Sequence, residues 1–99
     1  MTESALQRAI LDALAHWPDC HAFRVNAGSP IKGFRGAPKG TADIIGIIKG
    51  RFFALEVKLP KKKPSKHQVE FLRLIRSLGG IAEVVHNVDE ALHAVRSAD

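Results

Sequence analysis

The sequence predicts a small α/β (α+β) domain in which a mixed four-stranded sheet is flanked by helices. The chain has 99 residues, 45% of them hydrophobic, and this size fits one domain over residues 1–99 around one core. Apolar residues recur at helical spacing in three segments and form strand-like runs in four others, in the order α-β-β-β-α-β-α. The helix between the third and fourth strands makes a crossover unit, which normally joins parallel strands with a right-handed connection.

The first half of the chain contains a helix, a strand and a long loop. Residues 2–16 have an apolar stripe at helical spacing, and Thr2 or Ser4 can cap this helix. Residues 21–26 alternate well enough for a strand. Residues 27–40 hold four glycines and two prolines without periodicity, and a loop of this length in a small domain is often functional.

The second half begins with a predicted hairpin. Residues 44–48 and 52–59 are β-branched and aromatic runs on either side of Lys49-Gly50, which predicts a tight turn. A helix is predicted to begin at Ser65, where Ser65-x-x-Gln68 fits a capping box, and to stop at two glycines. Residues 81–85 are predicted as a strand, and a short helix begins at residue 88.

Several classes of protein are excluded by the composition. No apolar run approaches the ~20 residues that cross a bilayer, and the N-terminal segment lacks the pattern of a signal peptide. Cys20 is the one cysteine, so an intrachain disulfide framework and a cysteine-based zinc site are excluded. We therefore expect a protein without a membrane partner in a reducing cytoplasm.

The positive charge is concentrated in the middle of the chain. The net charge is +5, but from Arg24 to Lys66 there are eleven basic residues and two acidic ones. A basic middle segment indicates a polyanionic partner, most simply nucleic acid. A solvated surface rich in lysine explains the same charge equally well, so charge alone leaves both interpretations open.

The two acidic residues of this basic segment lie on the predicted hairpin. If Lys49 and Gly50 are the centre of a two-residue turn, then paired residues have numbers that sum to 99 and Asp43 faces Glu56. Lys58 is two residues beyond Glu56 and shares its face of the sheet. Like charges directly opposite each other are destabilising. A surface ion cluster with Lys58 paired to Glu56 is the ordinary alternative, but a divalent cation offsets the repulsion further, and hard oxygen ligands favour Mg²⁺ or Mn²⁺.

The spacing Asp43-x(12)-Glu56-x-Lys58 resembles the PD-(D/E)xK nuclease superfamily, and the detail is similar to its virus-type replication-repair nuclease domain, VRR-NUC. The resemblance covers essentially the whole chain, as expected for a stand-alone phage or bacterial member, and it implies the cytoplasm of a bacterial or phage-infected cell. Its patterns come in order along the sequence: Glu3, Asn26 with Gly28, Gly40-x-x-Asp43, Glu56-Val57-Lys58, Ser65-x-x-Gln68 and Gly79-Gly80. Ala42 departs from the family, which often has proline before the aspartate.

The resemblance implies a restriction-endonuclease-like αβββαβ core and metal-dependent hydrolysis of DNA. Asp43, Glu56 and the Val57 carbonyl would bind the metal, and Lys58 would orient or deprotonate the attacking water or stabilise the charge on phosphorus. Gln68 would help to position the metal site. Glu3 would reach the metal, although its carboxylate also suits the positive end of a helix, and Gln68 also suits a cap.

The expected DNA-binding residues flank this site in two basic segments. Phosphate contacts of this kind give affinity without sequence choice. The residues are Lys61, Lys62, Lys63 and Lys66 after the third strand, and Asn26, Arg35 and Lys39 around the glycine-rich loop. For any single lysine, a solvated turn is an equal alternative.

The leading functional hypothesis is a structure-selective DNA endonuclease that acts as a homodimer on branched DNA such as Holliday junctions. A flap- or restriction-type nuclease is the alternative within the enzyme class, and a non-catalytic nucleic-acid-binding module is the alternative outside it. The glycine-rich loop lacks the spacing of a P-loop, and the five histidines show no metal-ligand pairing.

Overall fold

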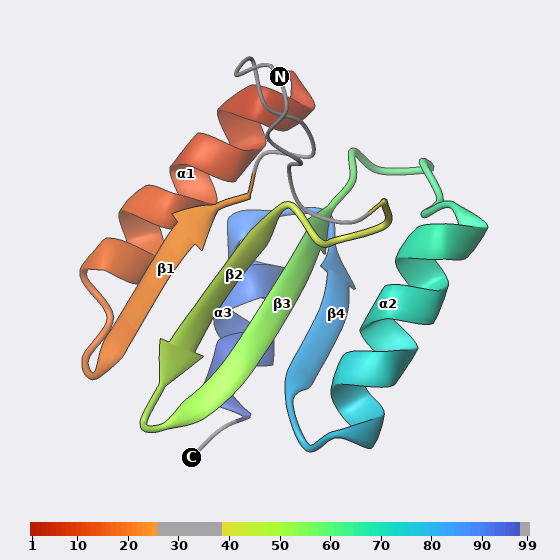
Figure 1. Ribbon diagram of the computed structural model, residues 1–99. Coiled ribbons are helices and arrows are strands. Elements are labelled where there is room, and N and C mark those ends of the chain that lie inside the picture. The colour runs from red at the N-terminus through yellow and green to blue at the C-terminus, as the bar shows by residue number, and fades with distance from the viewer. Residues whose placement is uncertain (26–38, 98–99) are drawn as a thin grey trace, which may run out of the picture.

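Four strands and three helices form three layers in the computed structural model, which describes residues 1–25 and 39–97 (Figure 1). The elements are, in order, α1 (Glu3–Ala15), β1 (Cys20–Arg24), β2 (Ile44–Ile48), β3 (Arg51–Val57), α2 (Lys66–Ser77), β4 (Ile81–Val85) and α3 (Val88–Arg96). The predicted order and fold class are confirmed. None of the described helices is long and apolar enough to span a membrane.

The sheet has the strand order β1-β2-β3-β4. β1 to β3 are antiparallel neighbours, whereas β3 and β4 are parallel and are joined through α2, as the predicted crossover requires. Ile44 pairs with Leu55 and Ile48 with Arg51, so the predicted register of the hairpin is confirmed. Lys49 and Gly50 both have positive φ angles, 49° and 80°, which is the geometry of a tight hairpin turn of the primed type.

Two apolar clusters hold the layers together, one on each face of the sheet. The larger cluster joins α1 and α3 to one face through residues that include Ile10, Phe53 and Val95, all fully buried. The smaller one places Leu72 of α2 against Ala54 and Ala82 on the other face. Alternating residues of β3 therefore serve different layers, and Glu56 is in phase with Ala54 on the α2 side.

The helix ends follow the predicted capping chemistry. Thr2, and not Ser4, caps α1, because its hydroxyl accepts a hydrogen bond from the Ala5 N–H at 3.0 Å. Ser65 and Gln68 form the predicted capping box at the start of α2. That cap fixes the first turn of α2 next to the end of β3, where the candidate site lies.

Candidate active site

Asp43 and Glu56 lie at the end of the hairpin that is farthest from its turn. Asp43 directly precedes β2 and Glu56 is the penultimate residue of β3, one step beyond the Ile44–Leu55 pair. Glu56 is the buried charged residue among those described, with 1% of its surface exposed. The two carboxylates are brought together because the turn sets the register of the whole hairpin.

Neighbouring groups hold each carboxylate in place. The backbone N–H of Val57 donates a hydrogen bond to Asp43 Oδ2 at 2.8 Å. The side-chain amide of Gln68 donates from Nε2 to Glu56 Oε2, also at 2.8 Å. The second oxygen, Glu56 Oε1, is buried and has no hydrogen-bond partner among the described residues. A buried oxygen without a partner is costly, and such a site suits a proton or a cation.

The surroundings of the carboxylate pair favour the protonated form of Glu56. The pKa of Glu56 is raised from 4.5 to about 8, chiefly because burial penalises the charged form and then because Asp43 is negative. The positive charge of Lys58 acts in the opposite direction. In the absence of a cation, the site therefore keeps a proton on Glu56 at neutral pH, which removes most of the repulsion between the carboxylates.

Gln68 has two roles that the sequence presented as alternatives. Its Oε1 accepts a hydrogen bond from the Ser65 N–H at 2.7 Å, while its own N–H donates to Ser65 Oγ at 3.2 Å. The cap therefore fixes which end of the amide faces Glu56, and the donor Nε2 is directed at the carboxylate. The family resemblance implied a place for Gln68 beside the metal site. The contact with Glu56 itself depends on the packing of α2 against β3, which the capping-box spacing does not reveal.

Lys58 and the basic segment follow directly from β3. Lys58 is half-buried, and its backbone N–H continues the pairing with β4 by donating to the Val85 carbonyl at 3.0 Å. The predicted DNA-binding lysines after β3 are all exposed, as is Lys39: Lys61, Lys62, Lys63 and Lys66. Asn26 and Arg35 lie outside the described residues.

Glu3 is not gathered with the other predicted ligands. It is the first residue of α1, which packs on the opposite face of the sheet from α2. Within residues 1–25 and 39–97, no three acidic, histidine or cysteine side chains are grouped so as to hold a metal ion. Among these residues, those that fit a hard divalent cation are therefore Asp43 and Glu56, because Oε1 of Glu56 lacks a partner there and both groups supply oxygen ligands.

Gly40 sets the approach of the chain to Asp43. Its φ is +88°, and a Cβ at this position would lie 2.6 Å from the backbone oxygen of His67 in α2. Glycine is required there for both reasons. Ala42 is fully buried against α2. The small residues before Asp43 thus let this segment lie close to the first turn of α2.

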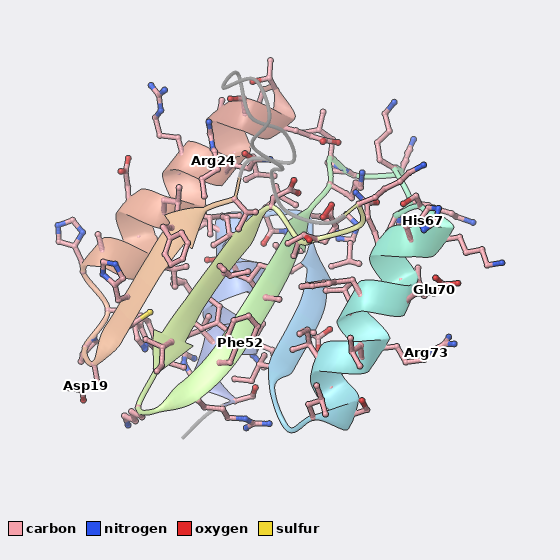
Figure 2. All side chains as sticks on the ribbon, in the orientation of Figure 1. Asp19, Arg24, Phe52, His67, Glu70 and Arg73 are labelled. Carbon is pink, nitrogen blue, oxygen red and sulfur yellow. The ribbon has the colours of Figure 1, made fainter. Side chains whose placement is uncertain are left out.

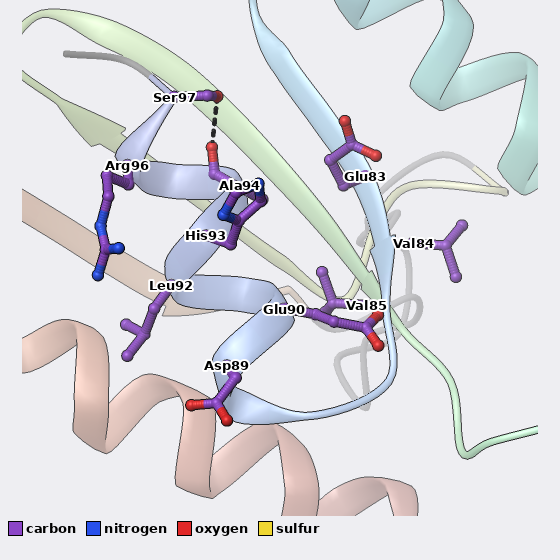
Figure 3. Close-up of a pocket in the computed structure, with 10 residues that line it drawn as sticks. All are labelled: Glu83, Val84, Val85, Asp89, Glu90, Leu92, His93, Ala94, Arg96 and Ser97. Atoms are coloured by element: carbon purple, nitrogen blue, oxygen red, sulfur yellow. Dashed lines mark hydrogen bonds between the residues drawn. The ribbon is translucent and has the colours of Figure 1, made fainter.

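A larger groove among the described residues lies elsewhere. It has a volume of about 670 Å³ between β4 and α3 and is lined by both acidic and basic side chains (Figure 3). Two of its carboxylates already have partners, since Glu83 lies 3.7 Å from Arg76 and Glu90 lies 2.9 Å from His86. We place the candidate site at Asp43 and Glu56, because the buried carboxylate without a full set of partners is there.

Comparison with solved structures identifies the fold. A protein described as a VRR_NUC domain protein superposes with a TM-score of 0.74 and 16% sequence identity, covering 98% of this chain and 87% of that one. A structure described as a VRR_NUC domain has a TM-score of 0.62 and 20% identity, covering 95% and 94%. Hjc, a Holliday junction resolvase from Archaeoglobus fulgidus, has a TM-score of 0.58 and 26% identity, covering 85% and 67%.

The sequence comparisons give no further relative. No family model matches the chain, and no curated protein matches it significantly. The chain has the restriction-endonuclease-like VRR-NUC fold, as its motifs implied.

Proposed function

Because the chain has the VRR-NUC fold, we propose that it is a metal-dependent DNA endonuclease that hydrolyses phosphodiester bonds of branched DNA. The observation that carries this proposal is the buried Glu56, whose Oε1 has no partner among the described residues and whose neighbour is a second carboxylate. In a structural ion cluster, buried side-chain oxygens are usually hydrogen-bonded. Likeness to a Holliday junction resolvase supports branched DNA, such as a four-way junction, as the substrate.

Asp43, Glu56 and the Val57 carbonyl would hold Mg²⁺ or Mn²⁺. The bound ion would act as a Lewis acid and lower the pKa of water. The protein residues prepare its site: the Val57 N–H holds Asp43 in place, and Gln68 holds Glu56 through Oε2 while Oε1 stays free. Both ligands are therefore oriented before an ion binds, which reduces the cost of binding.

Lys58 would take part in the hydrolysis of the phosphodiester bond. Its charge acts on Glu56, so the ammonium group lies near the pair, and it is half-buried at the end of β3. An amine at this place can orient the attacking water, take its proton, or stabilise the negative charge that develops on the phosphate. The exposed lysines from Lys61 to Lys66 would hold the neighbouring phosphates without reading sequence.

Cleavage of defined substrates tests this function. Purified protein is incubated with labelled four-way junction, flap and linear duplex in Mg²⁺, Mn²⁺ or EDTA. We expect cleavage that needs the ion and favours the junction; flap or duplex as the preferred substrate would favour the flap- or restriction-type alternative. Metal-independent cleavage, or binding without any cleavage, would overturn the proposal of a metal-dependent nuclease.

Variants separate chemistry from folding. Asp43→Asn keeps an oxygen for the Val57 N–H, and Lys58→Ala removes only the amine, so both should abolish cleavage while junction binding persists. Asp12→Asn on the exposed surface of α1 is the matched control and should cleave normally. If Asp43→Asn cleaves normally as well, Asp43 is not a metal ligand.

A further inference from the structure

A histidine that the proposed hydrolysis does not use lies at the rim of the candidate site. β3 and β4 are parallel, and their ends point to the same edge of the sheet (Figure 1). Val57 pairs with Val85, and the Lys58 N–H donates to the Val85 carbonyl. His86, the residue that follows β4, is therefore the next neighbour of Lys58 in register. Because adjacent strands are roughly 4.8 Å apart, His86 lies one strand away from Glu56.

The ring of His86 is held by a carboxylate from α3. Glu90 reaches from α3 to the end of β4 beside Val85 (Figure 3). Its Oε1 accepts hydrogen bonds from the His86 backbone N–H at 3.1 Å and from the ring Nδ1 at 2.9 Å. Its Oε2 accepts from the side chain of Asn87 at 3.2 Å. In a capping box this carboxylate would bond the backbone N–H of the cap residue, Asn87. Here it fixes an imidazole instead, which a helix cap does not require.

The bond to Glu90 determines what the other ring nitrogen can do. The pKa of Glu90 is lowered, chiefly by its hydrogen bond to His86, so the carboxylate is ionised at neutral pH and can only accept. Nδ1 therefore carries a hydrogen, and the neutral ring has a lone pair at Nε2. When the ring is protonated, Nε2–H becomes a positively charged donor. Among residues 1–25 and 39–97 no group bonds Nε2, and the side chain is 34% exposed.

The charges around the ring indicate which ligand fits. Glu90 contacts the ring, and Lys58 is its neighbour in register on β3. At the first turn of α2, Lys66 and His67 are exposed. Other charged side chains of these elements are paired or directed elsewhere: Glu83 by Arg76, Asp89 on the other side of α3 from Glu90 (Figure 3), and Glu70 and Arg73 on the outer surface of α2 (Figure 2). Because lysines surround this edge of the sheet, a phosphate is the ligand that a charged Nε2–H would meet there.

We propose that His86, in its protonated form, contacts a phosphate next to the scissile one and so positions the DNA strand across the site. Its Nε2–H would donate to a non-bridging oxygen of that phosphate, while Glu90 keeps Nδ1 turned away from the DNA. DNA binding would then favour the protonated ring, and the affinity would rise as pH falls. This inference rests on the proposed function, because it takes DNA as the substrate, but its test measures binding and needs no cleavage.

Binding of a labelled four-way junction at about pH 6 and about pH 8, on either side of the range in which histidine titrates, tests this role. EDTA prevents cleavage, and a constant ionic strength keeps screening equal. At the lower pH, His86→Gln should bind about ten-fold more weakly than wild type, because one charge-assisted hydrogen bond is lost. At the higher pH the two should agree within about two-fold. His86→Lys keeps its charge throughout and should bind about ten-fold more tightly than His86→Gln at both pH values.

His16→Gln is the matched control. The ring of His16 is also held through Nδ1, which donates to the Asp12 carbonyl at 2.9 Å. It follows α1 at the opposite end of the sheet from the site, where the Lys49 N–H of the hairpin turn donates to the Asp19 carbonyl. His16→Gln should therefore bind the junction like wild type at both pH values.

Several outcomes would overturn the proposal for His86. These are equal binding by wild type and His86→Gln at the lower pH, a deficit that is the same at both pH values, His86→Lys binding no more tightly than His86→Gln, or the same deficit in His16→Gln. Loss of the wild-type circular dichroism in both His86 variants would show a structural role and would also overturn it. If wild type binds and cleaves the junction and His86→Gln behaves identically, this inference alone fails. If wild type binds no DNA, the proposed function fails with it.

Discussion

Replacing Glu56 by glutamine is expected to stabilise the metal-free protein, and by an amount that grows with pH. The folded protein raises the pKa of Glu56 from 4.5 to about 8, so the folded state binds this proton more tightly than the unfolded chain. The stability that comes from the proton is fully present below the unfolded pKa. It is lost as pH rises through the window from 4.5 to about 8.

The magnitude follows from the width of that window. Each pH unit inside it removes about 1.4 kcal/mol from the free energy of unfolding, so the loss is about 3 kcal/mol at pH 7 and at most about 5 kcal/mol above pH 8. Glutamine resembles the protonated acid. Its oxygen can accept from Gln68 as Oε2 does, and its amide can face Asp43. Glu56→Gln should therefore not lose free energy of unfolding as pH rises, and its side chain should keep the contacts with Gln68 and Asp43.

Urea denaturation in EDTA measures this effect. Trp17 is the single tryptophan and lies half-buried beneath Arg96, so its fluorescence reports unfolding. At about pH 5, 7 and 9 the difference between Glu56→Gln and wild type should grow from near zero to several kcal/mol. Glu70→Gln, an exposed position on α2, should show no such trend. A difference that does not change with pH, or a destabilised Glu56→Gln at the highest pH, would refute the reasoning.

Three further outcomes are expected. Ser65→Ala removes the acceptor of the Gln68 N–H and should lower the free energy of unfolding by about 1 kcal/mol in urea denaturation. The rate of DNA cleavage should fall as well, and Ser65→Thr should restore both stability and cleavage. Slow cleavage by Ser65→Thr would contradict a capping role. Mg²⁺ at about a hundred times its Kd should stabilise the wild type by about 2.7 kcal/mol. Its binding should also release a proton at neutral pH, which calorimetry in buffers of different ionisation enthalpy measures. No proton release would count against a protonated Glu56. Gly46→Ala should cost about 1–3 kcal/mol or more in thermal unfolding, because its Cβ would lie 2.5 Å from the Phe53 ring, and a neutral result would show that this contact relaxes.

The hairpin was predictable because its turn is local. Lys49-Gly50 fixes the register, and the register alone brings Asp43 to Glu56. The identity of the strands and helices was likewise readable from their periodicity. Thr2 and Ser4 were both available as caps for α1, and Thr2 is the residue that caps it. The first residue of a helix often shifts by one or two positions because the alternative ends differ little in free energy.

Tertiary contacts account for what the sequence did not reveal. Gln68 bonds Glu56 only because the crossover returns α2 to the end of β3, and capping-box spacing says nothing about that neighbour. The run of isoleucines in β2 predicts burial on both faces, yet Ile47 is 50% exposed. Which part of the sheet lacks a helix depends on where α2 packs, so the exposure of Ile47 could not be recognised from the pattern of residues.

The central claim is that Asp43 and Glu56 form a divalent-metal site, and anomalous diffraction from crystals soaked in Mn²⁺ tests it most directly. The account predicts an anomalous peak in contact with Asp43 and with Oε1 of Glu56, the oxygen that has no hydrogen-bond partner in the part of the chain that the structure describes. In crystals of Glu56→Gln the peak should weaken or vanish. A strong peak elsewhere, with Asp43 and Glu56 unchanged, would contradict the account.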